Sequence, residues 1–238
     1  MRWLVVPPAL AALGLVAALG IAPAQADGGG SERAASASKP KTEPAQVTIM
    51  GDSHIVLMIN DLYPGAYVNG REGIRLDETF LIYGLNGIKL TQVLNGRGIV
   101  KAGERAVGTT DVRKWRKAIS TGPNTIVVNL GTNDGGPKAW DINAFMRLAG
   151  KDRRVFWIKP YYTSCPLCRV LHDVELKAAA KRHANLKLIK VGDLGLTLGP
   201  DGLHAFGRTN SQALWNRIME KVLPSPEPTP SPEPSAPA

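Results

Sequence analysis

Short runs of apolar and β-branched residues recur through the middle of the chain, separated by longer stretches in which apolar and charged residues mix. Because these runs are almost continuously apolar, they predict strands that are buried on both faces, as in a parallel sheet. The predicted strands are VTIMG at 47–51, TFLIYG at 79–84, TIVVNLG at 125–131, VFWIKP at 155–160 and LKLIKVG at 186–192.

The stretches between and after these runs predict helices. Asp111 is a suitable N-cap for one of them, and Gly150 is a suitable residue to end another. The alternation of strands and helices predicts a three-layer α/β/α sandwich with a parallel sheet of about five strands. The predicted helices are HIVLMINDLY at 54–63, IKLTQVLNG at 88–96, DVRKWRKAIS at 111–120, KAWDINAFMRLAG at 138–150, CRVLHDVELKAAAKRHA at 168–184 and GRTNSQALWNRIMEKVL at 207–223.

Both ends of the chain differ in composition from the middle. Residues 1–26 carry Arg2, then an apolar run that ends in Ala-Gln-Ala, which predicts a secretory signal peptide rather than an uncleaved membrane anchor. Residues 27–45 are polar and predict a disordered linker, and the Pro-rich residues 224–238 predict an extended, disordered tail. We therefore expect one folded domain over 46–223 in a secreted protein, cell-wall associated, with no stable membrane insertion after signal cleavage.

Charge and cysteine content narrow the classes of partner. The net charge of +9 suits an anionic cell-surface polymer, whereas no nucleic-acid-binding module is present, so we expect no nucleic-acid partner. Cys165 and Cys168 form the sequence CPLC, for which a disulfide is the first expectation in an exported protein and a redox-active pair is the alternative. We expect no metal site, since there is no second cysteine pair or histidine cluster.

Three short motifs carry candidate chemistry: GDSH at 51–54, GTND at 131–134 and DGLH at 201–204. Ser53 follows a predicted strand and opens a predicted helix, where it would be a candidate nucleophile. A serine hydroxyl needs a base of near-neutral pKa, which His204 can supply, and the base needs a carboxylate such as Asp201 to orient it. Taken singly, GDSH is better explained as a helix cap and DGLH as a turn, and GTND alone can be a β-turn.

An ester-cleaving site also needs hydrogen-bond donors for an oxyanion, each typically worth roughly 3–4 kcal/mol of barrier. The candidates are the Ser53 backbone N–H, the Asn133 side-chain amide and a glycine N–H from GLNG at 84–87. We choose Gly87 rather than Gly84, because Gly87 directly precedes a predicted helix. Asp134 is expected to brace the loop rather than to react.

The order Ser53, Gly87, Asn133 and Asp201-x-x-His204 resembles the SGNH (GDSL-like) hydrolase family over about residues 47–222. The resemblance implies a flavodoxin-like sandwich and a serine esterase, deacetylase or acyltransferase that needs no cofactor. It also implies Ser53 as nucleophile, His204 as base, Asp201 as its orienting carboxylate, and an oxyanion hole of Ser53, Gly87 and Asn133. Two departures are a long segment from Asp61 to Glu78 and Ala205 where the family has proline.

We therefore expect a secreted esterase that forms an acyl-enzyme on Ser53 and acts on a small ester or an acylated polysaccharide. The alternatives are an O-acyltransferase that uses the same serine with a glycan acceptor, and a non-catalytic wall-binding module of the same fold. The other histidines are assigned no reaction step: His54 is expected at the surface or lining the pocket, and His172 and His183 are expected to be solvated.

Overall fold

A computed structural model describes residues 45–96, 98–101 and 109–223 of the chain. The predicted signal peptide, the predicted linker up to residue 44 and the Pro-rich tail lie outside these residues. Among the helices of the described ranges, none is both long enough and apolar enough to cross a membrane.

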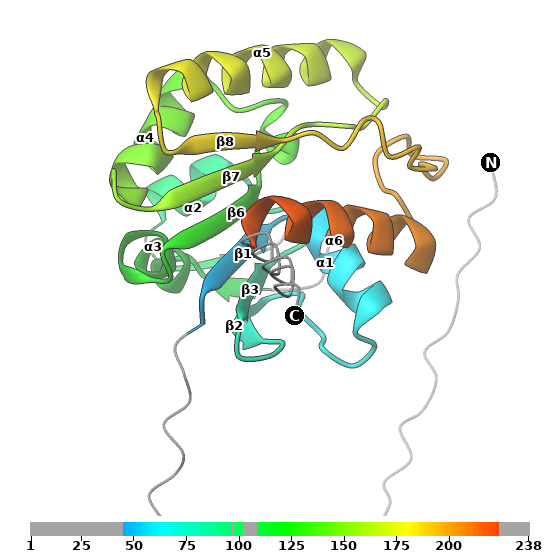
Figure 1. Ribbon diagram of the computed structural model, residues 1–238, viewed down its shortest axis with the longest axis horizontal. Coiled ribbons are helices and arrows are strands. Elements are labelled where there is room, and N and C mark those ends of the chain that lie inside the picture. The colour runs from blue at the N-terminus through cyan, green and yellow to red at the C-terminus, as the bar shows by residue number, and fades with distance from the viewer. Residues whose placement is uncertain (1–44, 97, 102–108, 224–238) are drawn as a thin grey trace, which may run out of the picture. The chain divides into compact units, whose positions relative to one another are not determined.

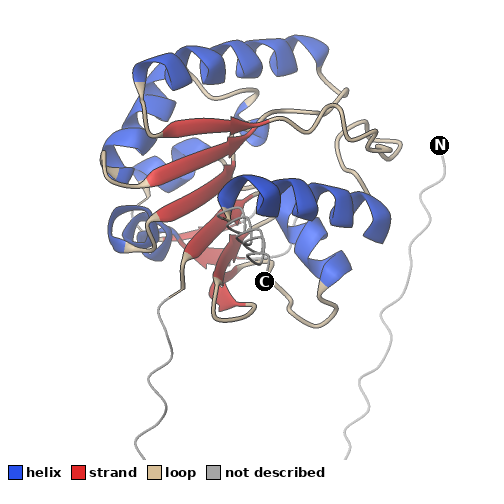
Figure 2. Cartoon of the chain, in the orientation of Figure 1, coloured by secondary structure: helices blue, strands red, loops and turns tan. Residues whose placement is uncertain are grey.

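A six-stranded sheet forms the middle layer, with strand order β2-β3-β1-β6-β7-β8 (Figures 1 and 2). Five neighbouring strands of this sheet are parallel, and they coincide with the five predicted apolar runs. Their order is that of a flavodoxin-like sheet. These strands are β1 (Val47–Gly51), β3 (Phe80–Gly84), β6 (Thr125–Asn129), β7 (Arg154–Ile158) and β8 (Leu186–Ile189).

The prediction of an all-parallel sheet of about five strands was incomplete at one edge. β2 (Arg71–Arg75) lies antiparallel to β3 and belongs to the segment that the sequence showed only as a long connection. Its sequence, REGIR, is charged and partly exposed, so it lacks the apolar run that marks a buried strand. A separate two-stranded antiparallel sheet of β4 (Ile99–Lys101) and β5 (Thr109–Asp111) was also not predicted.

Helices cover both faces of the sheet. α2, α3, α4 and α5 pack on one face and α1 and α6 on the other (Figure 1). Asp111 caps α3 and Gly150 ends α4, as predicted, whereas α2 begins at Leu90, two residues later than expected. The helices are α1 (Ser53–Leu62), α2 (Leu90–Asn95), α3 (Val112–Thr121), α4 (Ala139–Ala149), α5 (Pro166–Arg182) and α6 (Arg208–Val222), with a 3-10 turn η1 at Thr132–Asp134.

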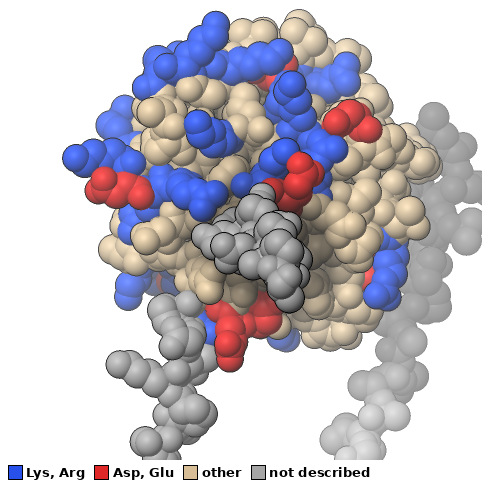
Figure 3. Space-filling model, in the orientation of Figure 1, with Lys and Arg blue, Asp and Glu red and all other residues tan. Residues whose placement is uncertain are grey.

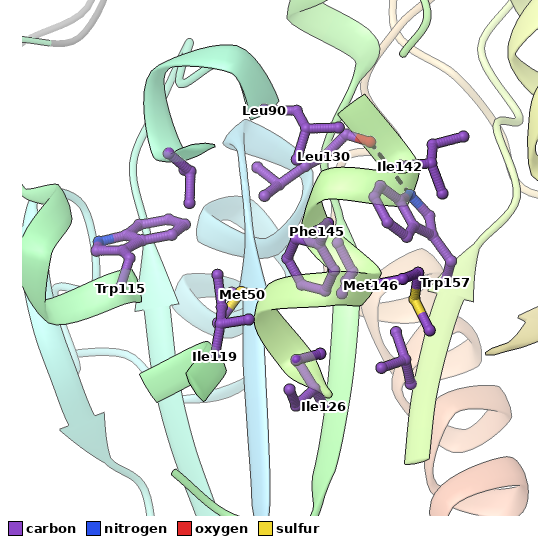
Figure 4. Packing of buried hydrophobic residues seen from close by; sticks show 14 of the residues in the cluster. Met50, Leu90, Trp115, Ile119, Ile126, Leu130, Ile142, Phe145, Met146 and Trp157 are labelled. Carbon is purple, nitrogen blue, oxygen red and sulfur yellow. Dashed lines mark hydrogen bonds between the residues drawn. The ribbon is translucent and has the colours of Figure 1, made fainter. Parts of the chain in front are cut away.

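Large side chains fill the space between the sheet and the helices. On the face that α2 to α5 cover, Phe145 and Trp157 meet edge to face with ring centroids 5.2 Å apart (Figure 4). The buried indole N–H of Trp157 donates to the Leu130 carbonyl at 3.2 Å, so its polar atom is satisfied. This packing fixes the end of β6, from which the GTND motif leaves the sheet.

The register of the sheet brings two of the motifs to one edge. Gly51 lies opposite Gly84 in β3 and Asn129 in β6, so the three strands end level with one another. A Cβ at Gly51 would lie 2.4 Å from Ile55 Cγ1 and 2.8 Å from the Asn129 oxygen, which explains why glycine occupies the turn. The loops that follow β1, β3 and β6 therefore leave the sheet together, at the edge where parallel α/β sheets bind their ligands.

Candidate active site

Ser53 is the first residue of α1, directly after the end of β1. Asp52 is the N-cap of this helix, and its carboxylate accepts from the His54 backbone N–H at 3.1 Å. Backbone N–H groups in a first helical turn have no acceptor within the helix and favour negative charge near them. Ser53 thus presents its hydroxyl at a position that also suits an anion.

The side chains of Ser53, His204 and Asp201 form a continuous hydrogen-bonded chain. His204 Nε2 lies 2.6 Å from Ser53 Oγ, and His204 Nδ1 lies 2.6 Å from Asp201 Oδ2. Asp201 Oδ1 also accepts from the backbone N–H groups of Leu203 at 2.9 Å and His204 at 3.1 Å. The hydrogen bond from His204, followed by these backbone bonds, lowers the pKa of the Asp201 carboxyl to about 2. Asp201 is therefore ionised at neutral pH and holds a proton on Nδ1 of the ring.

The segment that leads into α5 holds the loop that carries His204. The backbone N–H groups of Thr163 and Ser164 donate to the Gly202 carbonyl at 2.6 and 2.9 Å. Gly202 has φ of +59°, and a Cβ there would lie 2.9 Å from Thr163 Oγ1, so the close approach favours glycine. Cys165 and Cys168 form a disulfide across the first turn of α5, next to these contacts.

Asn133 lies in the η1 turn that follows β6, beside the end of β1. Its Nδ2 donates to Asp52 Oδ2 at 3.2 Å and to the Ile88 carbonyl at 3.1 Å. Gly87, with φ of +75°, precedes Ile88 in the loop between β3 and α2. Gly84 instead lies within β3, where its carbonyl accepts from Gly70 at 2.9 Å. Of the two glycines considered from the sequence, Gly87 is thus in the loop that contacts Asn133.

Asp134 braces the neighbouring loop, as expected. Its carboxylate accepts from the backbone N–H of Leu90 at 2.7 Å and from the Thr91 hydroxyl at 2.7 Å. It therefore satisfies donors in the first turn of α2 and ties the loop after β3 to the loop after β6.

His54 is not a surface or pocket-lining residue, because it is only 4% exposed. Its Nδ1 lies 2.7 Å from Asp52 Oδ1, and its Nε2 lies 3.1 Å from the Leu203 carbonyl oxygen. The ring of His54 points inward from α1 and packs near the rings of Tyr161 and His204, with ring centroids 5.2 Å away in each case. An Asp two residues before a His at a helix start was the signal in the sequence for the Asp52 contact.

The expectation of a solvated His172 was also wrong, because the residue is 1% exposed in the middle of α5. No protein atom within the described ranges is a hydrogen-bond partner of either ring nitrogen. Burial lowers the pKa of His172 to about 4. His183 is half-buried, and its Nε2 lies 2.8 Å from Asn143 Oδ1.

The described residues contain no group of three or more His, Cys, Asp or Glu side chains arranged to hold a metal ion. The groups around Ser53 are a hydroxyl, an imidazole, a carboxylate and an amide. Together they can move a proton from Ser53 to His204 and offer donors to a developing anion, which is the chemistry of acyl transfer.

No protein-family model and no curated protein sequence matches the chain. Among solved structures, the fold is similar to the C-terminal catalytic domain of peptidoglycan O-acetyltransferase A from Streptococcus pneumoniae, solved with a methylsulfonyl adduct. The TM-score is 0.52 and the identity 10%, over 75% of this chain and 92% of that one. A member of the lipolytic G-D-S-L family from Veillonella parvula aligns with a TM-score of 0.47 and 17% identity, over 74% of this chain and 97% of that one.

At these identities the similarity shows the fold alone. The chain has an SGNH hydrolase-like α/β/α fold with a mostly parallel sheet, as the sequence resemblance implied. The activity is then a question of the site and not of the fold.

Proposed function

We propose that this protein is a secreted serine esterase that cleaves carboxylic esters through an acyl-enzyme on Ser53. The observation that carries the proposal is the chain of two 2.6 Å hydrogen bonds from Ser53 through His204 to Asp201. This arrangement supplies a nucleophile, a base and an orienting carboxylate in the geometry that serine catalysis needs.

In the proposed reaction Ser53 Oγ attacks the ester carbonyl while His204 Nε2 takes the hydroxyl proton. Asp201, which stays ionised because its pKa is about 2, stabilises the imidazolium that forms. His204 then returns the proton to the departing alcohol oxygen, which leaves an acyl group on Ser53. A water molecule, activated by the same imidazole, attacks this acyl group and releases the acid.

The oxyanion of the tetrahedral intermediate would lie at the start of α1. We propose the Ser53 N–H, the Gly87 N–H and Asn133 Nδ2 as its donors. Both hydrogens of the Asn133 amide are directed to Asp52 and Ile88 in this structure, so one of these bonds is exchanged when the oxyanion forms. Catalytic hydrogen bonds commonly tighten only when substrate is present.

The proposed substrate is a small ester or an O-acetylated polysaccharide at the cell wall. Its support is the predicted signal peptide, the disulfide and the net charge of +9. In the face shown in Figure 3, Lys and Arg side chains are more widespread than Asp and Glu. A cavity of about 610 Å³ lies between α5 and the end of β8. Its lining holds the cations Lys159, Arg169, Lys177 and Lys190 and the carboxylates Asp173 and Asp193, and Asp173 pairs with Lys159 and Lys177. The cations outnumber the carboxylates, which favours contact with an anionic polymer.

The test of the esterase is the variant Ser53→Ala with p-nitrophenyl acetate as substrate. We expect kcat/KM to fall by about 10⁴-fold or more, since the reaction loses its nucleophile. The matched control is Ser120→Ala, on the distant helix α3, which should retain full activity. Full activity of Ser53→Ala, with an unchanged circular dichroism spectrum, would remove the proposal.

A second candidate is an O-acyltransferase that passes the acyl group from Ser53 to a glycan hydroxyl. The name of the fold neighbour from Streptococcus pneumoniae supports keeping this candidate. The two candidates share every step up to the acyl-enzyme and differ only in the acceptor. Adding a glycan to the assay and measuring acetylated glycan beside released acetate distinguishes them, and esters of increasing chain length define the acyl group.

A further inference from the structure

The buried ring of His54 joins two parts of the site that are far apart in the sequence. On one side, Nδ1 lies 2.7 Å from Asp52 Oδ1. On the other side, Nε2 lies 3.1 Å from the carbonyl oxygen of Leu203, the residue before His204. Asp52 in turn accepts from Asn133 Nδ2 through its second oxygen. One chain of contacts therefore runs from the loop of Asn133 to the loop of His204.

Counting protons assigns the state of this ring. A backbone carbonyl can only accept, and an ionised carboxylate can only accept. Asp52 already accepts from the His54 backbone N–H and from Asn133, as a carboxylate does. With Asp52 as the ionised carboxylate, both ring nitrogens of His54 donate, and a histidine that donates from both nitrogens is an imidazolium cation.

The carboxylates and the carbonyl beside the ring favour a buried cation, whereas the imidazole of His204, with its ring centroid 5.2 Å away, supplies no negative charge. Burial itself opposes the charge, but Asp52, the Leu203 carbonyl and Asp201 outweigh it, so the pKa of His54 is raised above its ordinary value. Tyr161 faces the ring edge and stays neutral, because burial raises the pKa of its hydroxyl. His172, the other buried histidine, is neutral because its pKa is about 4.

We propose that His54 is a positioning residue: its imidazolium cation, held beside Asp52, donates from Nε2 to the Leu203 carbonyl, and this bond fixes the loop that presents His204 to Ser53. The proposal rests on the proposed esterase function. The outer side of the same loop is held by Thr163 and Ser164 through the Gly202 carbonyl. Two successive carbonyls of the DGLH loop are thus held by different segments of the chain. Thr163 and Ser164 hold the Gly202 carbonyl, and His54 holds the Leu203 carbonyl, next to the catalytic imidazole.

A matched pair of variants separates the two bonds of His54. The amide nitrogen of His54→Gln can replace Nε2 and keep the bond to Leu203, whereas the shorter amide of His54→Asn can replace Nδ1 and keep the bond to Asp52. We expect His54→Gln to retain kcat within about fivefold. We expect His54→Asn to lose about 10- to 100-fold in kcat with little change in KM, because displacing a catalytic group by about 1 Å can cost 10²-fold.

His183→Gln is the control, since the ring of His183 contacts only Asn143 among the side-chain contacts described and lies at the far end of α5. Equal losses of kcat in His54→Gln and His54→Asn, or no loss in His54→Asn, would overturn the positioning role. The dependence of kcat on pH gives a second measurement, which a purely structural role of His54 would leave unchanged. The cation is lost as pH rises through a pKa above 6.5, so wild-type kcat should decline there, and His54→Gln should lack this decline.

Ring ¹⁵N and proton NMR spectroscopy makes the result independent of turnover. At about pH 6, below the ordinary histidine pKa, both nitrogens of His54 should carry protons, and the His204 Nδ1 proton should stay sharp in His54→Gln but broaden in His54→Asn. A His54 ring with one unprotonated nitrogen would overturn the inference even in an active enzyme. Conversely, the expected spectra in a protein without esterase activity would overturn the proposed function and leave the positioning of His204 intact.

Discussion

Two histidines of this fold are both buried, but their pKa values are shifted in opposite directions. His54 is 4% exposed and His172 is 1% exposed. The pKa of His54 is raised above its ordinary value, whereas the pKa of His172 is lowered to about 4. Burial therefore does not decide the charge of a histidine in this protein; the partners of its two ring nitrogens do.

The partners follow from where each residue lies in the fold. His54 is in the first turn of α1, where the N-cap Asp52 is two residues away and the DGLH loop passes over the ring. His172 lies in the middle of α5 and faces the loop after β6, where a Cβ added to Gly131 would be 3.2 Å from its Nε2. Tyr162 is its aromatic neighbour, with ring centroids 6.5 Å apart. The N-cap at the start of α1 thus supplies a carboxylate to the buried ring of His54. Within the described residues, the middle of α5 supplies no carboxylate that hydrogen-bonds to the ring of His172.

Removing the Asp52 carboxylate should have the largest effect on the difference between His54 and His172. Asp52→Ala deletes the N-cap of α1 and the anion beside His54, so we expect a loss of about 3 kcal/mol in the free energy of unfolding at pH 7. The pKa of His54 should then fall below 6.5 and resemble that of His172. Urea unfolding and ring NMR spectroscopy measure the two effects.

Asp111→Ala is the matched control for this experiment, because Asp111 is the N-cap of α3 but faces Arg113 at the surface. It should cost about 1 kcal/mol, the usual value of a cap. If Asp52→Ala costs no more than Asp111→Ala and leaves the pKa of His54 raised, the buried ion pair is not what distinguishes the two histidines.

Acid should act on His172 with an effect of similar size. Its folded-state pKa of about 4 lies below the unfolded value of 6.5, so the unfolded chain binds the extra proton first. Stability is then lost as pH falls from 6.5 toward 4, by up to about 3 kcal/mol. His172→Leu should remove this loss, and comparing unfolding free energies of the variant and wild type at pH 7 and pH 4.5 measures it.

At pH 7 His172→Leu should be near neutral in stability, because the wild-type ring has no described hydrogen-bond partner to lose. An acid dependence that is the same in His172→Leu and wild type would show that His172 does not resist protonation. His54 is expected to act in the opposite range of pH, since its contribution is complete below 6.5 and is lost as pH rises.

The sequence was sufficient for the parts of the fold that depend on local patterns. Continuous apolar runs mark the five parallel strands, and the positions of GDSH and GTND directly after two of them place both motifs at one edge of the sheet. β2 was not predictable in this way, because REGIR at an exposed edge has no apolar run. Its place depends on pairing with β3, which is a tertiary contact.

The buried histidines show why the rest of the site was not predictable. On α5 the apolar residues Val170, Leu171 and Val174 are more than half exposed, whereas His172 is buried with Leu176 and Ala179. The helical spacing of 172, 176 and 179 was present in the sequence, but apolarity pointed to a different face. The bond of His54 to Leu203 joins residues 149 positions apart, so no local pattern could indicate it.

Reaction of the protein with a fluorophosphonate probe, followed by peptide mass spectrometry, tests most directly whether Ser53 is an activated nucleophile. The hydrogen bond from Ser53 to His204 predicts that wild type gains one phosphonyl group, on Ser53, and that Ser53→Ala and His204→Ala gain none. Folded wild-type protein that stays unmodified, or that is modified at another residue while Ser53 remains free, would contradict the account.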